Sequence, residues 1–324
     1  MLLAAATILI GFIILIWSAD LFVAGAASIA QNLGMSPIII GLTIVSLGTS
    51  APEILVSMTA SMSGSGILAI GNAIGSNIAN IALVLGVTVL VAPLMVHEQC
   101  MKKEVPLLLI ATGGVGLLIY DAQLSQLDGV IMMSVLLLVV AILIRKQFKD
   151  ADLVAEAEDE PLPSLSPLRA WLTFLFGLVL LIGSSKMLVW GAVLAANELG
   201  VSELIIGLTI VAVGTSLPEL AATIASAMRG HTEIALGNII GSNLFNILAV
   251  MSIPGIVASQ ELEPEVITRD YITMGALTLF LAFAIYISRK RSKSRPGHAY
   301  LGRTLGTLLV SFYALYYYLL HTTL

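Results

Sequence analysis

Long apolar runs along the chain alternate with short breaks that carry polar residues or proline. About 20 apolar residues suffice for a helix to cross the hydrocarbon core of a bilayer. Backbone polar groups in lipid must find partners inside the protein, so these runs are expected to be helices. The breaks predict ten spans, at residues 2–31, 36–62, 67–92, 105–121, 125–145, 168–197, 202–228, 233–257, 270–288 and 303–320. The expected fold class is an all-α integral membrane protein with ten transmembrane helices.

Composition supports this interpretation. Of 324 residues, 58% are hydrophobic and 11% are charged, and the mean hydropathy is +1.01. A soluble domain carries about 25% charged residues, so too few charges are present to cover a soluble surface. The single cysteine, Cys100, excludes an intramolecular disulfide and a thiolate metal cluster. No basic stripe indicates nucleic-acid binding, and the expected surroundings are the lipid bilayer.

The basic residues predict the orientation of the chain. With the N-terminus outside, only Arg269 falls in an outer loop, and Lys186 falls within a span. The others fall inside: Lys102, Lys103, Arg145, Lys146, Lys149, Arg169, Arg229, Arg289, Lys290, Arg291, Lys293, Arg295 and Arg303. The positive-inside rule therefore favours an even number of spans, with both termini at the periplasmic or external face.

A polar stretch at residues 145–167 divides the chain into two halves. It contains six acidic residues and three prolines, and we interpret it as a flexible cytoplasmic linker between residues 1–144 and 168–324. Binding of a regulatory cation by its acidic residues is the less favoured alternative.

The two halves share a sequence repeat. Residues 34–81 align without gaps to residues 200–247 at a constant shift of 166 (200 minus 34), and about half of the positions are identical. Gly48-Thr49-Ser50-Ala51-Pro52-Glu53 recurs as Gly214-Thr215-Ser216-Leu217-Pro218-Glu219, and Gly71-Asn72-Ala73-Ile74-Gly75-Ser76-Asn77 recurs as Gly237-Asn238-Ile239-Ile240-Gly241-Ser242-Asn243. Five spans in each half make these inverted repeats, an arrangement that secondary transporters use for alternating access.

Each repeat places one glutamate about halfway along a span, Glu53 in the second and Glu219 in the seventh. An ionised carboxylate in the membrane is unfavourable unless compensated, so such residues are usually functional. The alternative is that each pairs with a buried base. Lys186, whose repeat counterpart is Asp20, is the intramembrane base, and one lysine cannot neutralise two glutamates. We expect Asp20 and Lys186 to be anchors or caps.

Oxygen-bearing residues accompany both glutamates. Ser46, Thr49, Ser50 and Glu53 lie at spacings of three and four, on one helix face, and Ala212, Thr215, Ser216 and Glu219 repeat the pattern with only a backbone carbonyl at Ala212. Pro52 and Pro218 should loosen each helix and free carbonyl oxygens. The third and eighth spans add Asn72, Ser76, Asn77 and Asn80, and Asn238, Ser242, Asn243 and Asn246. Interhelical hydrogen bonding is the alternative role for these last eight.

These oxygen ligands predict a hard cation. No histidine lies deep within a predicted span, and oxygen sites favour Ca²⁺ or Na⁺, whereas Mg²⁺ prefers to keep its waters. Two carboxylates balance one Ca²⁺ or two Na⁺ ions. An empty occluded site would hold two uncompensated charges, which favours obligatory exchange over leak. Protons are an alternative counter-ion, because protonating both glutamates also neutralises the site.

The doubled motifs Gly-Thr-Ser-x-Pro-Glu and Gly-Asn-x-x-Gly-Ser-Asn, spread over a ten-span chain, resemble the two α-repeats of the calcium/cation antiporter superfamily. Within it the chain is most similar to bacterial inner-membrane calcium/sodium antiporters related to the sodium/calcium exchangers. The resemblance implies four cation sites around Glu53 and Glu219, and a gating pair formed by the first and sixth spans. It implies further ligands at Thr49, Ser50, Thr215 and Ser216, the carbonyls of Ser46 and Ala212, the flanking Ser76 and Ser242, and the central Asn80 and Asn246.

Two departures from the family pattern change the expectation. Several relatives have Asp at the position of Asn246, and in potassium-dependent members an acidic residue in the second repeat is tied to the use of K⁺. Because this chain has asparagine at both Asn80 and Asn246, potassium dependence is not expected here. The eukaryotic regulatory loop is missing, so activation by cytosolic Ca²⁺ is not expected either.

The function expected is secondary active exchange of Na⁺ for Ca²⁺ in a bacterial inner membrane, by a monomeric unit without cofactors. Proton-coupled calcium exchange is the nearest alternative, and a passive cation channel is a second. An intramembrane hydrolase is a third, but the duplicated Ser, Thr and Asn residues suit an ion path better than an enzyme.

Overall fold

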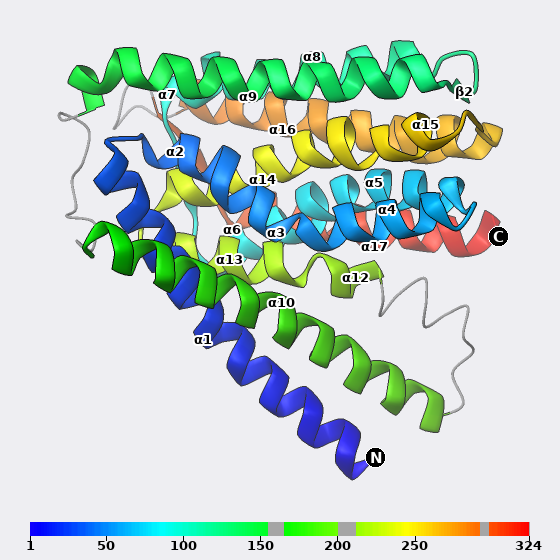
Figure 1. Ribbon diagram of the computed structural model, residues 1–324, viewed down its shortest axis with the longest axis horizontal. Coiled ribbons are helices and arrows are strands. Elements are labelled where there is room, and N and C mark those ends of the chain that lie inside the picture. Colours follow the sequence, from blue (N-terminus) through cyan, green and yellow to red (C-terminus); the bar gives the residue numbers. More distant parts are fainter. Residues whose placement is uncertain (155–164, 200–211, 292–297, 324) are drawn as a thin grey trace.

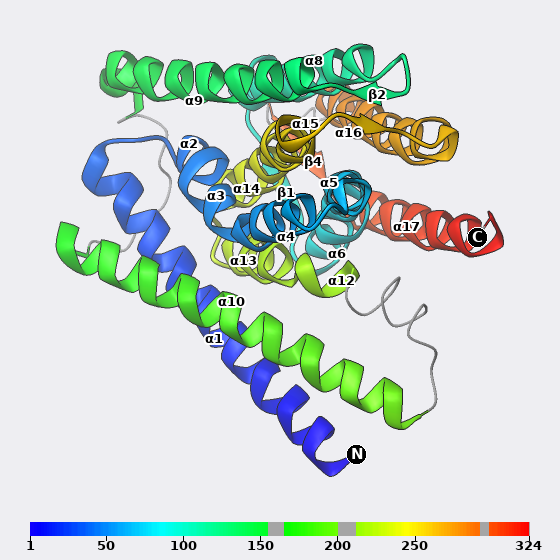
Figure 2. The same cartoon turned by 45° about the vertical axis from the view of Figure 1, so that its right-hand side comes forward.

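The computed structural model describes residues 1–154, 165–199, 212–291 and 298–323, most of them in helices. The two longest helices, α1 (Leu2–Leu33) and α10 (Pro167–Glu198), form a crossed pair at one side of the molecule in both Figure 1 and Figure 2. The remaining helices pack into a body beside this pair. The helical membrane fold expected from the sequence is confirmed, with four short strands added to it.

The body consists of helices from both halves. The first half contributes α2 (Pro37–Ile40), the π-helical turn η1 (Gly41–Val45), α3 (Ser46–Thr49), α4 (Ala51–Met62), α5 (Gly66–Ala79), the π-helical turn η2 (Asn80–Leu85), α6 (Gly86–Val91), α7 (Glu98–Lys102), α8 (Glu104–Leu118) and α9 (Gln126–Val154). The second half contributes α12 (Ala212–Thr215), α13 (Leu217–Met228), α14 (Thr232–Phe245), η4 (Asn246–Val250), α15 (Ser252–Val257), η5 (Val266–Tyr271), α16 (Ile272–Arg291) and α17 (Arg303–Thr323).

Several of these segments are long and apolar enough to cross a bilayer, so the chain is a multi-pass membrane protein. Within the described ranges there are six: Leu2–Leu33, Gly66–Val91, Gln126–Leu143, Pro167–Ala196, Thr232–Val257 and Val266–Arg289. The pair Pro37–Thr49 and Ala51–Met62, bent by 46°, makes a seventh if it counts as one span. Helices also occupy the expected spans at 105–121, 202–228 and 303–320, but they are shorter or more polar, and residues 200–211 lie outside the described part.

Two short antiparallel ladders join the halves. Strand β1 (Leu94–Val96) pairs with β4 (Ala299–Leu301), and β2 (Gln123–Leu124) pairs with β3 (Gln260–Glu261). These strands lie in the connections between helices, which the hydrophobic pattern did not predict as strands.

Helices α1 and α10 pack through glycines that occur in matched pairs. A Cβ atom on Gly25 would lie 2.5 Å from the backbone nitrogen of Phe174, and one on Gly177 would lie 2.6 Å from that of Phe22. Gly191 and Ile8 are the repeat counterparts of Gly25 and Phe174, at the shift of 166, and they are also in contact. Gly11 and Leu188 are the counterparts of Gly177 and Phe22, and they are in contact as well. The contacts across this pair therefore follow the shift of 166 found in the repeat.

Helix α14 packs directly on the second span of the first half. A Cβ atom on Gly237 would lie 2.5 Å from the carbonyl oxygen of Ile38, and one on Gly41 would lie 2.6 Å from that of Ile234. Such close backbone approach is the role of small residues between membrane helices. It brings the polar residues that follow Gly41 on η1 and α3 against α14.

The charged side chains of α1 and α10 lie away from the body's centre. Asp20 pairs with Arg229, which follows α13, with distances of 2.5 Å and 2.6 Å. Lys186 is exposed. The pairing of Asp20 agrees with its expected role as an anchor.

A cluster of ionisable side chains lies beside the ladder of β1 and β4. The register that pairs Val96 with Ala299 brings the next residues, His97 and His298, together with ring centroids 4.6 Å apart. The Nδ1 atom of His97 lies 2.7 Å from a carboxylate oxygen of Glu233 at the start of α14. The nearby carboxylate of Glu233 raises the pKa of His97.

The contact between His97 and Glu233 predicts how stability varies with pH. A raised pKa means that the contact stabilises the fold fully below the unfolded value of about 6.5, and that this contribution is lost as the pH rises through the higher folded value. Between about pH 6 and pH 8, Tm in detergent should fall more steeply for the wild type than for His97→Gln. Glu233→Gln removes the partner and should flatten the profile equally. Parallel profiles for all three proteins would contradict this prediction.

Candidate cation-binding site

The two repeat motifs produce the same break in two helices. Ser50 separates α3 from α4 with φ −82° and ψ 4°, and Ser216 separates α12 from α13 with φ −89° and ψ 5°. Pro52 and Pro218 lie in the first turn of the helix that follows, where the missing N–H has no helical partner to lose. The loosening expected from the prolines is thus a complete interruption of each helix.

Glu53 and Glu219 lie in the first turns of α4 and α13 and are each 1% exposed. The N-terminal end of a helix carries partial positive charge, which favours a carboxylate there. The two carboxyl groups are close enough to interact electrostatically. Ion pairs among the described residues involve other side chains. Pairing of either glutamate with a base, the alternative considered from the sequence, is therefore not observed in the described part of the chain.

Side chains from the two halves meet directly at these breaks. The Ser50 hydroxyl donates to a carboxylate oxygen of Glu219 at 3.3 Å. The Thr49 hydroxyl lies 3.4 Å from that of Ser242 and donates to the amide oxygen of Asn238 at 3.1 Å. One site is thus built from both repeats, and Figure 2 shows α4, α13 and α14 together near the middle of the body.

Buried polar atoms without hydrogen-bond partners concentrate here. Within the described residues they include both carboxylate oxygens of Glu53, one of Glu219 and the hydroxyl of Ser216. They also include the side-chain amide nitrogen and oxygen of both Asn80 and Asn246. Buried polar groups in proteins normally have partners, and an uncompensated buried carboxylate is especially unfavourable. These oxygens are thus suited to coordinating a cation.

The two central asparagines lie at the start of π-helical turns. Asn80 begins η2 and Asn246 begins η4, and both side chains are buried. Helix α4 packs against η4, and α13 packs against η2. Each glutamate-bearing helix therefore faces the asparagine turn of the other half. Single π-helical turns of this kind are frequent at functional sites.

Other polar residues near the site form hydrogen bonds between helices. The Asn72 amide donates to the carbonyl of Glu53 at 3.4 Å, and the Asn238 amide donates to Thr223 at 2.9 Å. These two asparagines thus take the interhelical role considered as the alternative. Ser57 donates to the carbonyl of Val250 at 2.7 Å. Sequence reasoning missed Ser57 and Thr223, although each lies four residues after its glutamate, on the same helix face.

The other ligands expected from the sequence lie on α3, α5 and α12. The Ser46 hydroxyl donates to the carbonyl of Leu42 at 2.7 Å, and the Ser46 carbonyl accepts from the Ser50 N–H at 2.9 Å. Ser76 is buried on α5. Thr215 ends α12 and is half-buried, and Ala212 begins that helix.

The chemistry of the site is that of oxygen ligands. In the described part of the chain, no three His, Cys, Asp or Glu side chains come together. The site instead combines two carboxylates with hydroxyl, amide and carbonyl oxygens, a set that suits Na⁺ and Ca²⁺.

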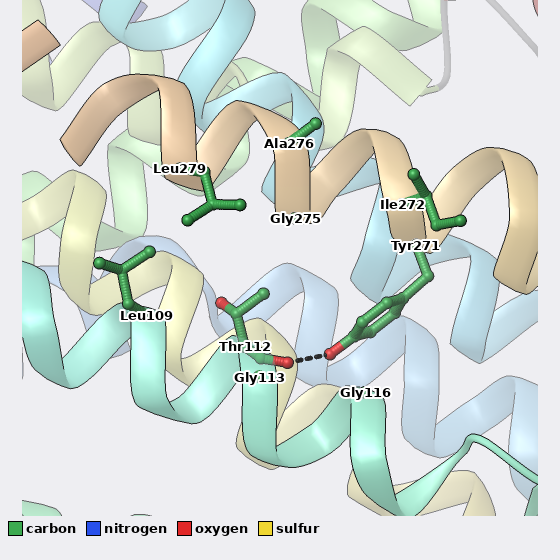
Figure 3. A pocket seen from close by; sticks show the side chains of 9 residues that line it. All are labelled: Leu109, Thr112, Gly113, Gly116, Tyr271, Ile272, Gly275, Ala276 and Leu279. Atoms are coloured by element: carbon green, nitrogen blue, oxygen red, sulfur yellow. Dashed lines mark hydrogen bonds between the residues drawn. The ribbon is translucent and has the colours of Figure 1, made fainter. Parts of the chain in front are cut away.

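A crevice of about 450 Å³ between α8 and α16 is separate from this site. Its lining is mainly apolar, and its polar contact is the hydroxyl of Tyr271, which donates to the carbonyl of Thr112 at 2.5 Å (Figure 3). No carboxylate is among the residues that line the crevice.

Comparisons with known proteins place the chain in a family. The family described as sodium/calcium exchanger protein matches twice, at residues 3–145 and 169–321. The chain is 44% identical to CaxA of Alkalimonas amylolytica, whose name describes it as a candidate antiporter, over the full length of both proteins. It is 38% identical to the inner membrane protein YrbG of Escherichia coli, over 95% of this chain and 94% of that protein.

The structure is also similar to that of a solved exchanger. It superimposes on the sodium-calcium exchanger NCX_Mj with a TM-score of 0.81 and 29% sequence identity, covering 97% of both chains. The resemblance expected from the repeat motifs is thereby confirmed. The chain belongs to the sodium/calcium exchanger protein family.

Proposed function

We propose that this protein is a secondary active antiporter that exchanges Na⁺ for Ca²⁺ by alternating access. The observation that carries the proposal is the pair Glu53 and Glu219: two buried carboxylates that interact with each other and form no ion pair with a base among the described residues. Two negative charges in an apolar interior require positive charge from bound ions. The names of the relatives, an antiporter and a sodium-calcium exchanger, support the same activity.

Charge balance accounts for exchange without leak. One Ca²⁺ or two Na⁺ ions neutralise the two carboxylates, so either load allows the site to be occluded. Occlusion of the unloaded site would bury two like charges, each at a cost of several kcal/mol. The protein therefore changes access readily only when it is loaded, and the sodium gradient drives calcium transport.

The proposed ligands follow the breaks and the turns around them. Glu53 and Glu219 are the carboxylate ligands shared between ions. Further oxygens come from Thr49, Ser50, Thr215, Ser216, Ser76, Ser242, Asn80 and Asn246, and from the carbonyls of Ser46 and Ala212. Neutral asparagine at positions 80 and 246 makes an additional K⁺ unnecessary for charge balance.

Alternating access requires two halves that exchange conformations. We propose ten spans in two inverted halves, residues 1–144 and 168–324, joined by a linker at 145–167. The shift of 166 in the contacts between α1 and α10 supports the repeat, as do the matching angles at Ser50 and Ser216. Helix α9 continues into the linker as far as Val154, and residues 155–164 lie outside the described part. In this proposal α1 and α10 slide as the gate.

The proposed location is a bacterial inner membrane, with both termini at the periplasmic face. The distribution of Lys and Arg supports this orientation. Because α4, α13 and α14 of one chain supply the carboxylates and their surroundings, we propose that the functional unit is a monomer without cofactors.

Replacing either site carboxylate should abolish exchange. Glu53→Gln or Glu219→Gln leaves a single carboxylate to balance a divalent ion. Removing one charged partner from a buried ion pair costs about 3–5 kcal/mol. Sodium-driven ⁴⁵Ca²⁺ uptake into proteoliposomes should fall to background, while the purified variants remain folded. Glu104→Gln is the matched control, because Glu104 is also buried but lies at the start of α8. Wild-type rates in either site variant would refute the assignment.

The coupling ion is identified by imposing one gradient at a time. With Na⁺ inside the vesicles and none outside, ⁴⁵Ca²⁺ uptake should exceed that of vesicles with equal Na⁺ on both sides. A pH gradient without Na⁺ should give no uptake, because the hydroxyl-rich surroundings of each carboxylate suit sodium coordination. Uptake driven by the pH gradient alone would favour the proton-coupled alternative. Uptake that needs no opposing ion would favour a channel.

A further inference from the structure

The carbonyl of Gly214 lacks the donor that a regular helix would give it. Residue 218, four positions later, is a proline without an N–H. The carbonyl accepts a hydrogen bond from the hydroxyl of Ser185 on α10 instead, at 2.9 Å, and this contact is buried. The break that precedes Glu219 is thereby tied to one of the two long helices.

Gly214 also determines how closely α10 approaches the break. A Cβ atom on Gly214 would overlap Cγ2 of Val189, which lies four residues after Ser185 on the same face of α10. A larger residue at position 214 would push α10 away and lengthen the hydrogen bond. The glycine and the serine therefore form one fitted contact between the long helix and the site.

The first half has no equivalent of this hydrogen bond. At the shift of 166, Gly214 corresponds to Gly48, but Ser185 corresponds to Ala19, which has no hydroxyl. Gly48 lies instead near Leu178, whose methyl groups would be 3.3 Å and 3.4 Å from an added Cβ atom.

The neighbouring serine behaves identically in both halves. Ser184 donates to the carbonyl of Leu181 at 3.0 Å, and its counterpart Ser18 donates to the carbonyl of Leu15 at 3.0 Å. Both bonds stay within their own helix. Of these two adjacent positions, only the second differs between the halves, with Ser185 in one half and Ala19 in the other.

We propose that Ser185 is a positioning residue that latches α10 to the Glu219 break in one of the two gate positions. This inference rests on the proposed function, in which the two halves exchange conformations as α1 and α10 slide. In the opposite gate position Ala19 would face the break before Glu53, and it has no hydroxyl to donate to Gly48. The latch therefore biases the equilibrium toward the position described here.

The size of the bias follows from the worth of one hydrogen bond. A neutral hydrogen bond inside a protein changes an equilibrium by about two- to tenfold. This is large enough to measure as a change of populations and small enough to leave the protein folded. If the hydrogen bond were made in both gate positions, its removal would lower the stability of both and leave their ratio unchanged.

The populations can be measured on the full chain by electron–electron distance spectroscopy in lipid nanodiscs. Spin labels are attached through Trp190→Cys on α10 and Leu117→Cys on α8, whose native side chains are 53% and 79% exposed. The buried Cys100 is replaced by alanine in every protein. Ser185→Ala should lower the ratio of the original distance population to the new one by about two- to tenfold. Ser185→Thr keeps the hydroxyl and should restore the ratio.

Two further variants keep the test decisive. Ser184→Ala removes an adjacent buried hydroxyl whose bond is internal to α10, and it should leave the ratio at the wild-type value. Ala19→Ser supplies the missing mirror hydroxyl and should shift the ratio in the same direction as Ser185→Ala. The latch is overturned if Ser185→Ala matches Ser184→Ala, or if Ala19→Ser fails to favour the new population.

Sodium-driven ⁴⁵Ca²⁺ uptake by the wild type is measured in parallel. If the wild type shows no exchange, the proposed function fails, whatever the spectroscopic ratio. If the wild type exchanges ions and the ratio does not respond to Ser185→Ala, the latch alone fails.

Discussion

The structure is organised around two carboxylates buried together in an apolar interior. Glu53 and Glu219 interact electrostatically and have no basic partner among the described residues. Such an arrangement is unfavourable by itself. The features around it lower that cost. Each carboxylate lies at the N-terminal end of a short helix, and the Ser50 hydroxyl of one half donates to Glu219 of the other. A bound cation would supply the remaining stabilisation, which links occlusion of the site to loading.

The sequence repeat gives the molecule two similar halves, and the halves differ in a few side-chain contacts. The contacts of α1 with α10 follow the repeat closely, as the matched glycines show. The contacts of α1 and α10 with the rest of the body do not follow the repeat. Asp20 on α1 pairs with Arg229 after α13, and Ser185 on α10 bonds to Gly214, where the first half has Ala19. The two helices are therefore matched in their contacts with each other and differ in the side chains that they present to the body. In the proposed latch, this difference favours one position of the pair.

The sequence predicted the helical membrane fold because apolar runs of this length have few alternatives in lipid. The burial of both glutamates was predictable because two copies of one motif marked them independently. The β ladders were not, because Leu94–Val96 and Ala299–Leu301 pair over a long separation that no local pattern reveals. The π-helical turns at Asn80 and Asn246 were also missed, since they depend on packing between the halves. The roles of Asn72 and Asn238 needed coordinates, because an amide that forms a hydrogen bond between helices and one that binds an ion look alike in sequence.

In the proposed function, both carboxylates bind the same transported ion. Anomalous diffraction from crystals grown with Ca²⁺, or with Sr²⁺ in its place, would locate that ion directly. The account predicts a peak within direct coordination distance of oxygens from both Glu53 and Glu219, about 2.3–2.6 Å for Ca²⁺. A peak bound to only one of them, or a structure in which each carboxylate pairs with a basic group of the protein, would contradict it.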